Sequence, residues 1–183
     1  MKKYCWIQHP TRGRVQFNLY PFQEGTLNLL QKNDRNIILK SRQLGISTLS
    51  AGISLWMMVF QKDKSILVVA TKQDTAKNLV TKVKFMYDNL PSWLQIGFTE
   101  KNKLALRLKN GSQIKAVSAA SDAGRSEAIS LLIIDEAAFI EENRIEEIWG
   151  SSQQTLSTGG KAIVLSTPNG TGNFFHRMWI KAE

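Results

Sequence analysis

The sequence predicts an α/β fold in which helices flank a mostly parallel central sheet and an antiparallel hairpin extends it. Two apolar runs, Ile66 to Val69 and Leu131 to Ile134, contain no polar residue. Such runs are typical of strands buried on both faces of a parallel sheet. Helical patterns separate the runs, which favours right-handed strand–helix–strand crossovers. One strand is followed directly by a segment that resembles a phosphate-binding loop. These features together predict a P-loop NTPase.

Five strands and three helices are expected along the chain. The strands are Asn36 to Leu39, Ser65 to Ala70, Leu104 to Leu108, Leu131 to Asp135 and Ala162 to Ser166. The helical patterns lie at Thr48 to Phe60, Gln73 to Asn89 and Ile145 to Thr155. No internal repeat or low-complexity linker interrupts this series. A single domain over residues 1–183 is therefore expected.

One segment departs from the alternation of strands and helices. Leu104 to Leu108 is followed by Asn110 and Gly111, and then by the apolar-rich stretch Ser112 to Val117. An Asn-Gly pair between two strand patterns indicates a tight type I′ hairpin. The segment should therefore add antiparallel strands to the parallel sheet.

Composition limits the class of protein. The hydrophobic content of 43% is enough for a core, and the net charge of +9 suits a polyanionic partner such as nucleic acid, although a solvated basic surface would have the same charge. Cys5 is the only cysteine, which excludes an internal disulfide. Met1 to Pro10 lacks the apolar core of a signal peptide. A soluble, intracellular domain is expected.

The segment from Lys40 to Thr48 is the candidate phosphate loop. The usual pattern is G-x-x-x-x-G-K-[ST] between a strand and a helix, and Gly45 and Ser47 occupy the second-glycine and hydroxyl positions. Ile46 stands where the lysine belongs, and Lys40 stands at the first glycine. Backbone N–H groups at the helix start can still bind phosphate oxygens. Lys40 can supply the missing charge from the other end of the loop, and Arg42 adds a permanently charged donor.

A second motif lies where the apolar run Leu131 to Ile134 ends in Asp135 and Glu136. An apolar strand ending in two carboxylates is the pattern that presents an acid to a nucleotide's magnesium ion. Asp135 would hold the metal through its water shell, and Glu136 would polarise the attacking water. The two motifs together predict nucleotide hydrolysis.

Aromatic residues and a glutamine precede the first expected strand. The amide of Gln23 offers a donor and an acceptor that match the N6 and N7 edge of adenine. Phe22 or Tyr20 can stack on the base. The alternative is that these aromatic side chains pack at the edge of the domain.

Two further polar loops are candidate functional segments. Arg125 lies in a small-residue loop before the acidic strand, where an arginine can act on the nucleotide of a neighbouring subunit or simply face solvent. Ser166, Thr167 and Pro168 end the last strand, and carboxyl ends of strands face the ligand crevice of an α/β sheet. Ser166 or Thr167 can sense the γ-phosphate there.

Taken together, these residues resemble the ATPase domain of the large terminase subunit, the DNA-packaging motor of tailed bacteriophages. The resemblance covers almost the whole chain, in the family's order. It rests on Tyr20-Pro21-Phe22-Gln23, Ser41-Arg42-Gln43-Leu44-Gly45, Ala123-Gly124-Arg125, Ile134-Asp135-Glu136-Ala137-Ala138-Phe139 and Ser166-Thr167-Pro168-Asn169-Gly170. The Ser-Arg-Gln-Leu-Gly loop and the Asp-Glu-Ala-Ala-Phe run are specific as a pair.

The resemblance implies an additional-strand ATPase fold that couples ATP hydrolysis to translocation of double-stranded DNA into a capsid. By position it implies adenine contact at Gln23, magnesium at Ser47 and Asp135, a catalytic base at Glu136 and a trans-acting finger at Arg125. Arg42 corresponds to a loop arginine proposed as a catalytic sensor, and Ser166, Thr167 and Pro168 correspond to the coupling motif. The implied nucleotide contacts are Phe22, Gln23, Lys40, Ser41, Arg42, Gln43, Leu44, Gly45, Ile46, Ser47 and Thr48.

The same resemblance implies a layout and a set of partners. Residues 1–35 would form an adenine-binding segment and residues 36–183 the P-loop core, and the family's C-terminal nuclease domain is absent, so no DNA cleavage is expected. The cofactors would be ATP and Mg²⁺. The partners would be double-stranded DNA, a portal protein, a small terminase subunit and further copies of the chain in a ring, with a monomer in isolation. The setting would be the host cytoplasm.

Two other functions fit part of the sequence. Gln23 and the Asp-Glu-Ala-Ala run also resemble helicase motifs, although such helicases need a second motor-like domain that this chain lacks. Because Ile46 cannot replace a lysine, the chain can also be a DNA- or partner-binding module that holds nucleotide with little turnover. Many members of the terminase family carry lysine where Ile46 stands, and others have it at the start of the loop, as Lys40 is here.

Overall fold

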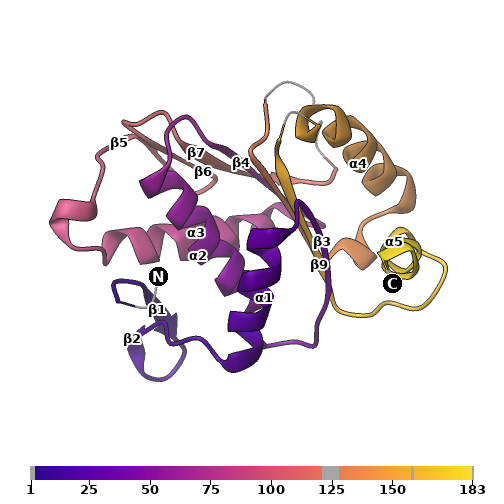
Figure 1. Ribbon diagram of the computed structural model, residues 1–183, viewed down its shortest axis with the longest axis horizontal. Helices are drawn as coiled ribbons and strands as arrows, with labels where there is room; N and C mark the ends of the chain where they lie inside the picture. The colour runs from indigo at the N-terminus through magenta and orange to yellow at the C-terminus, as the bar shows by residue number, and fades with distance from the viewer. Residues whose placement is uncertain (1–2, 121–127, 158, 183) are drawn as a thin grey trace.

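The computed structural model describes residues 3–120, 128–157 and 159–182 and contains one large sheet (Figure 1). Its seven strands lie in the order β3-β9-β8-β4-β7-β6-β5. Their bounds are Arg35–Leu39 for β3, Lys161–Ser166 for β9, Leu131–Asp135 for β8, Ser65–Ala70 for β4, Gln113–Ser118 for β7, Ala105–Leu108 for β6 and Phe98–Lys101 for β5. The α/β class predicted from the sequence is confirmed.

The order of the strands brings the two predicted motifs to one edge of the sheet. Strands β3, β9, β8, β4 and β7 are parallel neighbours, whereas β6 pairs antiparallel with both β7 and β5. Strand β9 lies between β3, which precedes the phosphate loop, and β8, which ends at Asp135. This inserted strand is the additional strand expected for the fold. In the register of the sheet, Leu39 pairs with Ser166 and Asp135 with Leu165.

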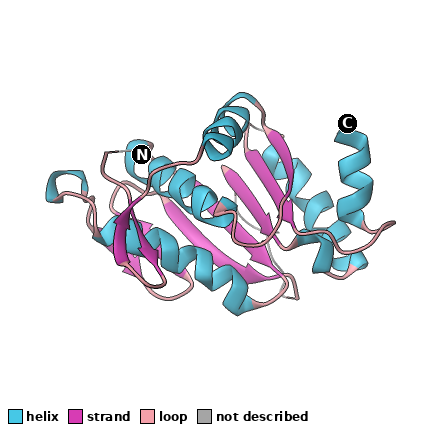
Figure 2. Ribbon diagram, turned by 90° about the horizontal axis from the view of Figure 1, so that it is seen from below, coloured by secondary structure: helices cyan, strands magenta, loops and turns pink. Residues whose placement is uncertain are grey.

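Helices cover the sheet in two groups (Figure 1). On one side lie α1 (Pro21–Lys32), α2 (Ile46–Phe60) and α3 (Gln73–Asp88), and on the other lie α4 (Glu142–Leu156) and α5 (Phe174–Ala182). Figure 2, turned by 90°, shows the strands running between these two groups. No helix in the described ranges has the length and apolar content required to cross a bilayer.

The covering of both faces explains why the β8 run is continuously apolar. Leu131 and Ile133 belong to the core shared with α2 and α3, whereas Leu132 and Ile134 belong to the core shared with α4 and α5. All four side chains are buried. Each residue along the strand points to the face opposite its neighbour, and both faces meet helices, so alternation with polar residues disappears.

The sequence missed several short elements. They are the hairpin of β1 (Trp6–His9) and β2 (Gly13–Gln16), helices α1 and α5, strand β5 and the 3₁₀ helices Ser92–Leu94 and Ala137–Phe139. The four-residue strands β1 and β2 carry charged and polar residues and no buried side chain. A strand of four residues is too short to show a hydrophobic period.

The hairpin between β6 and β7 exists, but the predicted type I′ turn is wrong. That turn requires positive φ at both central residues, and only Gly111, at φ +84°, has it. The Gly111 N–H donates to Leu108 O at 3.1 Å, and Leu108 N–H donates to Ser112 O at 2.9 Å, which indicates a three-residue loop with a bulge at the glycine. The Asn110 amide instead donates to Met58 O at 2.8 Å, so a tertiary contact holds this loop.

Candidate nucleotide site

The phosphate loop joins the end of β3 to the start of α2. Gly45, immediately before the helix, has φ +71° and ψ +13°, and Gln43 also has positive φ, at +63°. These left-handed residues turn the chain sharply. The Gly45 carbonyl accepts the first helical hydrogen bond, from Leu49 N–H at 2.9 Å. The free N–H groups of the first turn of α2 therefore lie at the carboxyl edge of the sheet, where anions bind.

A hydroxyl from the loop meets a carboxylate from β8. Ser47 Oγ donates to Asp135 Oδ2 at 2.9 Å, although the two residues are 88 positions apart. Asp135 is buried. A hydroxyl and a carboxylate at this separation form a small set of hard oxygen donors, which is what Mg²⁺ takes from a protein when phosphates and waters complete its shell. The residues present therefore fit a magnesium ion.

Glu136 has an unusual backbone conformation. Its φ of +55° and ψ of +38° lie in the left-handed region, which costs a non-glycine residue about 1–2 kcal/mol. Its N–H donates to Asp135 Oδ1 at 2.9 Å, and its Oε2 accepts from Thr71 Oγ1 at 3.3 Å. Thr71, directly after β4, thus fixes the position of the second carboxylate. Sequence reasoning missed Thr71 because a lone threonine after a strand carries no motif.

Gln23 lies behind the phosphate loop. Its side chain is only 2% exposed, its Nε2 donates to Leu44 O at 2.8 Å, and its Oε1 accepts from Tyr20 N–H at 3.1 Å. The amide predicted to contact adenine therefore fixes the loop, and its contact with adenine stays a prediction. Phe22 and Tyr20 are exposed, and their rings are stacked with centroids 5.8 Å apart.

The segment predicted to couple hydrolysis to movement, Ser166 to Pro168, contacts both the phosphate loop and the turn that follows Asp135 and Glu136. Ser166 O accepts a hydrogen bond from Lys40 N–H at 3.0 Å, at the start of the phosphate loop. Ser166 Oγ accepts from Ala138 N–H at 3.1 Å and donates to Thr167 O at 2.8 Å. Asn169, a contact not assigned from the sequence, donates from Nδ2 to Ala138 O at 2.8 Å. Ser166 is fully buried, so it links the loop to the turn after Glu136.

Comparison with known proteins identifies the family. A family model described as the N-terminal region of the large terminase subunit, T4-like virus type, matches residues 37–183. The chain belongs to this family. It spans about two fifths of the length of the first similar structure, the large terminase of bacteriophage HK97, with 22% identity, 99% of this chain and 39% of that chain covered, and a TM-score of 0.78.

Two further solved structures share the fold of this terminase chain. One is the large terminase ATPase domain of Thermus phage P74-26, with 21% identity, 90% of this chain and 70% of that chain covered, and a TM-score of 0.69. The other is the N-terminal domain of the DNA-packaging ATPase of bacteriophage phi29, with 15% identity, 84% of each chain covered and a TM-score of 0.57. The additional-strand P-loop fold is thus shared across distant sequences.

The positively charged residues predicted for the site differ in how far they are buried. Lys40 is partly buried and Arg42 is exposed, whereas the Ile46 side chain is buried in the core to which α2 and α3 contribute. The chain position that usually carries the lysine is therefore used for packing. Thr48 is partly buried and Ser41 exposed. Arg125 lies outside the described residues.

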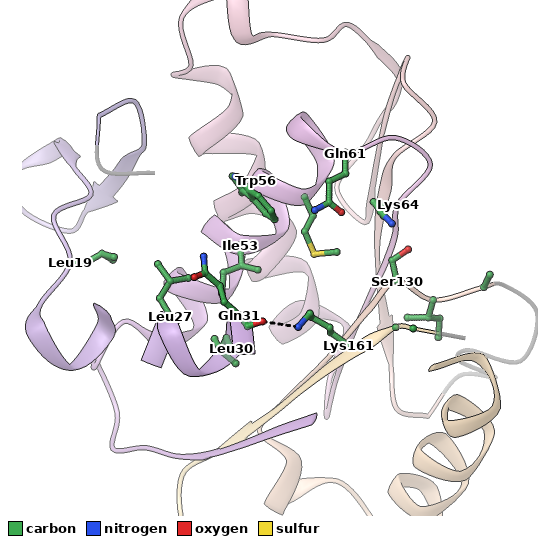
Figure 3. A pocket seen from close by; sticks show the side chains of 15 residues that line it. Leu19, Leu27, Leu30, Gln31, Ile53, Trp56, Gln61, Lys64, Ser130 and Lys161 are labelled. Atoms are coloured by element: carbon green, nitrogen blue, oxygen red, sulfur yellow. Dashed lines mark hydrogen bonds between the residues drawn. The ribbon is translucent and has the colours of Figure 1, made fainter. Parts of the chain in front are cut away.

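A large cavity lies away from this site. A space of about 590 Å³ opens between α1 and α2 at the opposite edge of the sheet, where Lys64, Ser130 and Lys161 begin or precede strands (Figure 3). The Lys161 ammonium donates a hydrogen bond there to Gln31 O at 3.1 Å. The cavity contains none of the predicted nucleotide contacts.

Substitution of Gly45 by alanine should damage the phosphate loop. A Cβ atom there would lie 2.7 Å from Gln23 Nε2, and the φ of +71° is strained for alanine. We expect Gly45→Ala to lower the free energy of unfolding by about 1–2 kcal/mol. Gly25→Ala in α1, where a Cβ meets nothing within 4 Å, should raise it by about 0.5–1 kcal/mol. Equal effects of the two changes in urea denaturation would contradict the described loop geometry.

Proposed function

We propose that this chain is the ATPase motor domain of a DNA-packaging machine, which hydrolyses ATP to move double-stranded viral DNA into a procapsid. The observation that carries the proposal is the hydrogen bond of 2.9 Å between Ser47 Oγ and Asp135 Oδ2, with Glu136 next in the chain. It joins the phosphate loop to the acidic strand. Membership of the large terminase family supports the same function.

Each residue near the phosphates has a separate role in this proposal. Ser47 and Asp135 would hold Mg²⁺, which when bound supplies positive charge to the phosphate oxygens. Glu136, held by Thr71 Oγ1 at 3.3 Å, acts as the base: its carboxylate orients the attacking water and accepts its proton. Lys40 and Arg42 stabilise the negative charge that develops on the phosphate oxygens during hydrolysis.

The remaining contacts with the nucleotide follow from the loop and from α1. Phe22 stacks on the base, and Gln23 contacts adenine while it fixes the loop. The other loop residues contribute mainly backbone N–H groups at the start of α2: Ser41, Gln43, Leu44, Gly45, Ile46 and Thr48. ATP and Mg²⁺ are therefore the proposed cofactors.

Ser166, Thr167 and Pro168 are assigned the coupling of ATP hydrolysis to DNA movement. Supporting this role, Ser166 accepts from Lys40 N–H on one side and from Ala138 N–H on the other. A shift of the loop on phosphate loss therefore has a direct hydrogen-bonded route to the turn after Glu136. A bistable arrangement of these bonds is what a coupling element needs.

The proposed partners follow from the charge and the family. Double-stranded DNA suits the net charge of +9. A portal protein, a small terminase subunit and further copies of the chain in a ring complete the motor, and Arg125 reaches the nucleotide of the neighbouring copy. The machine would assemble in the host cytoplasm.

ATP turnover with and without metal tests the function. With the chain in excess of radiolabelled ATP, phosphate release should require Mg²⁺ and fall to background in EDTA, because the Asp135 carboxylate repels the nucleotide's phosphates unless a cation lies between them. Double-stranded DNA should stimulate release more than single-stranded DNA does. Tight Mg·ATP binding without any release would indicate a nucleotide-binding module. Stimulation by single strands alone would favour a helicase-like translocase.

A further inference from the structure

The phosphate loop lacks a lysine at the position where the usual pattern carries one. Ile46 occupies the position of the usual lysine, and its side chain is only 3% exposed, packed in the core. Arg42 is exposed. A triphosphate carries several negative charges, and a buried site must neutralise them. A lysine outside the loop can therefore supply the missing positive charge.

Lys82 on α3 lies near this site although it belongs to no motif. It is partly buried, and no hydrogen bond or ion pair of its side chain is found in the described ranges. The neighbouring lysines of α3 differ, because Lys77 pairs with Asp74 at 3.7 Å and Lys84 with Asp88 at 2.7 Å. Lys82 is thus the α3 lysine left without an ion pair.

The charges that act on Lys82 come from the nucleotide site. Burial lowers the pKa of its ammonium, the negative charge of Asp135 opposes this shift, and the positive charge of Lys40 adds to it. Two lysines from distant parts of the chain thus repel one another beside the acidic strand. Such an arrangement costs free energy unless an anion lies between the two ammonium groups.

Open space lies beside the Lys82 side chain. A cavity of about 410 Å³ separates α3 from the N-terminal hairpin, and its walls include Lys82 and Thr48, in the first turn of α2. The flexible four-carbon stem of a lysine can move its ammonium through such a space. Lys82 can therefore approach phosphates bound at the start of α2 without rearrangement of the core.

We propose that Lys82 binds the β- and γ-phosphate end of ATP, supplying from α3 a positive charge that Ile46 does not supply from the phosphate loop. The inference rests on the proposed function, since it requires ATP in this site. It adds a lysine that the loop pattern does not contain. Lys82 and Lys40 then contact the triphosphate from two sides.

Nucleotide affinities of Lys82→Met measure this role. We expect the dissociation constant for Mg·ATP, from calorimetry on the whole chain, to rise about 10- to 100-fold, because a charge-assisted hydrogen bond is lost. The constant for AMP should change less than about twofold. Lys82→Arg, which keeps the charge, should recover part of the ATP affinity. Lys77→Met removes an equal charge from α3 at a side chain that pairs with Asp74, and it should leave both constants unchanged.

Thermal stability separates phosphate binding from a structural role. Folding lowers the pKa of Lys82, so its charged form opposes folding at neutral pH. Lys82→Met should therefore raise the melting temperature of the nucleotide-free chain, by about 2 °C. A lower melting temperature with equal losses for ATP and AMP would overturn the proposal. So would wild-type ATP affinity in Lys82→Met, whereas a wild-type chain that binds no ATP would instead overturn the proposed function.

Discussion

Glu136→Gln should abolish ATP hydrolysis while ATP binding is retained. The amide keeps the shape of the carboxylate and can still accept a hydrogen bond from Thr71 Oγ1, which lies 3.3 Å from Glu136 Oε2. It cannot accept a proton from water. Loss of a general base costs about 10²–10⁴-fold in rate, so we expect single-turnover hydrolysis to fall by about 10³-fold. The dissociation constant for Mg·ATP should stay within about threefold of the wild-type value.

A matched control for this change lies five positions along the chain. Glu141, at the start of α4, is exposed, and Glu141→Gln removes the same charge without reaching the site. It should hydrolyse ATP at the wild-type rate. If Glu136→Gln retained wild-type turnover, Glu136 would not be the base. If it lost ATP binding as well, its carboxylate would be needed to build the site rather than for the chemistry.

The backbone at Glu136 adds to the argument for its function. A left-handed residue at φ +55° is strained unless the surrounding structure holds it. Here the N–H bond to Asp135 Oδ1 and the Thr71 contact hold it, and the turn that follows is bonded to Ser166. Strain of this kind concentrates at functional sites. The conformation ends β8 at Asp135 and turns the chain at Glu136.

The sequence predicted the parts of the site that depend on strand ends. Ser47 and Asp135 meet because parallel strands deliver their following residues to one edge of the sheet, a consequence of topology that the apolar runs of β4 and β8 already indicated. The hydrogen bond from Ser47 Oγ to the Asp135 carboxylate is a consequence of this arrangement. The roles of these residues in catalysis stay predictions.

Other contacts were beyond the sequence for physical reasons. The helical pattern of α3 shows which face is apolar, but it cannot show that the charge of Asp135 acts on Lys82, because that depends on how α3 packs against α2. The bond from Gln23 Nε2 to Leu44 O depends in the same way on the docking of α1. The turn at Gly111 was predicted wrongly because Asn110 bonds to Met58 O, a residue far away in the chain.

Alanine substitutions in β8 should destabilise the chain strongly from either face of the sheet. Leu132 packs on the side of α4 and α5, and Ile133 on the side of α2 and α3, and neither side chain is exposed. Each change removes buried methyl groups and leaves a cavity, so each should lower the free energy of unfolding by about 2–5 kcal/mol in urea denaturation. A loss of that size is a large share of the stability of a typical domain, about 5–15 kcal/mol.

The two substitutions together test whether both cores are independently packed. Because the side chains lie on opposite faces with no shared core, the losses should add within about 0.5 kcal/mol in the double variant. Leu39→Ala, at a side chain that is 44% exposed at the end of β3, serves as the control and should cost under about 1 kcal/mol. A small loss at Leu132 beside a large one at Ile133 would mean that α4 and α5 do not cover the sheet as described. In that case the turn after Glu136, which is bonded to β9 through Ser166 on the same side, would also lack its support.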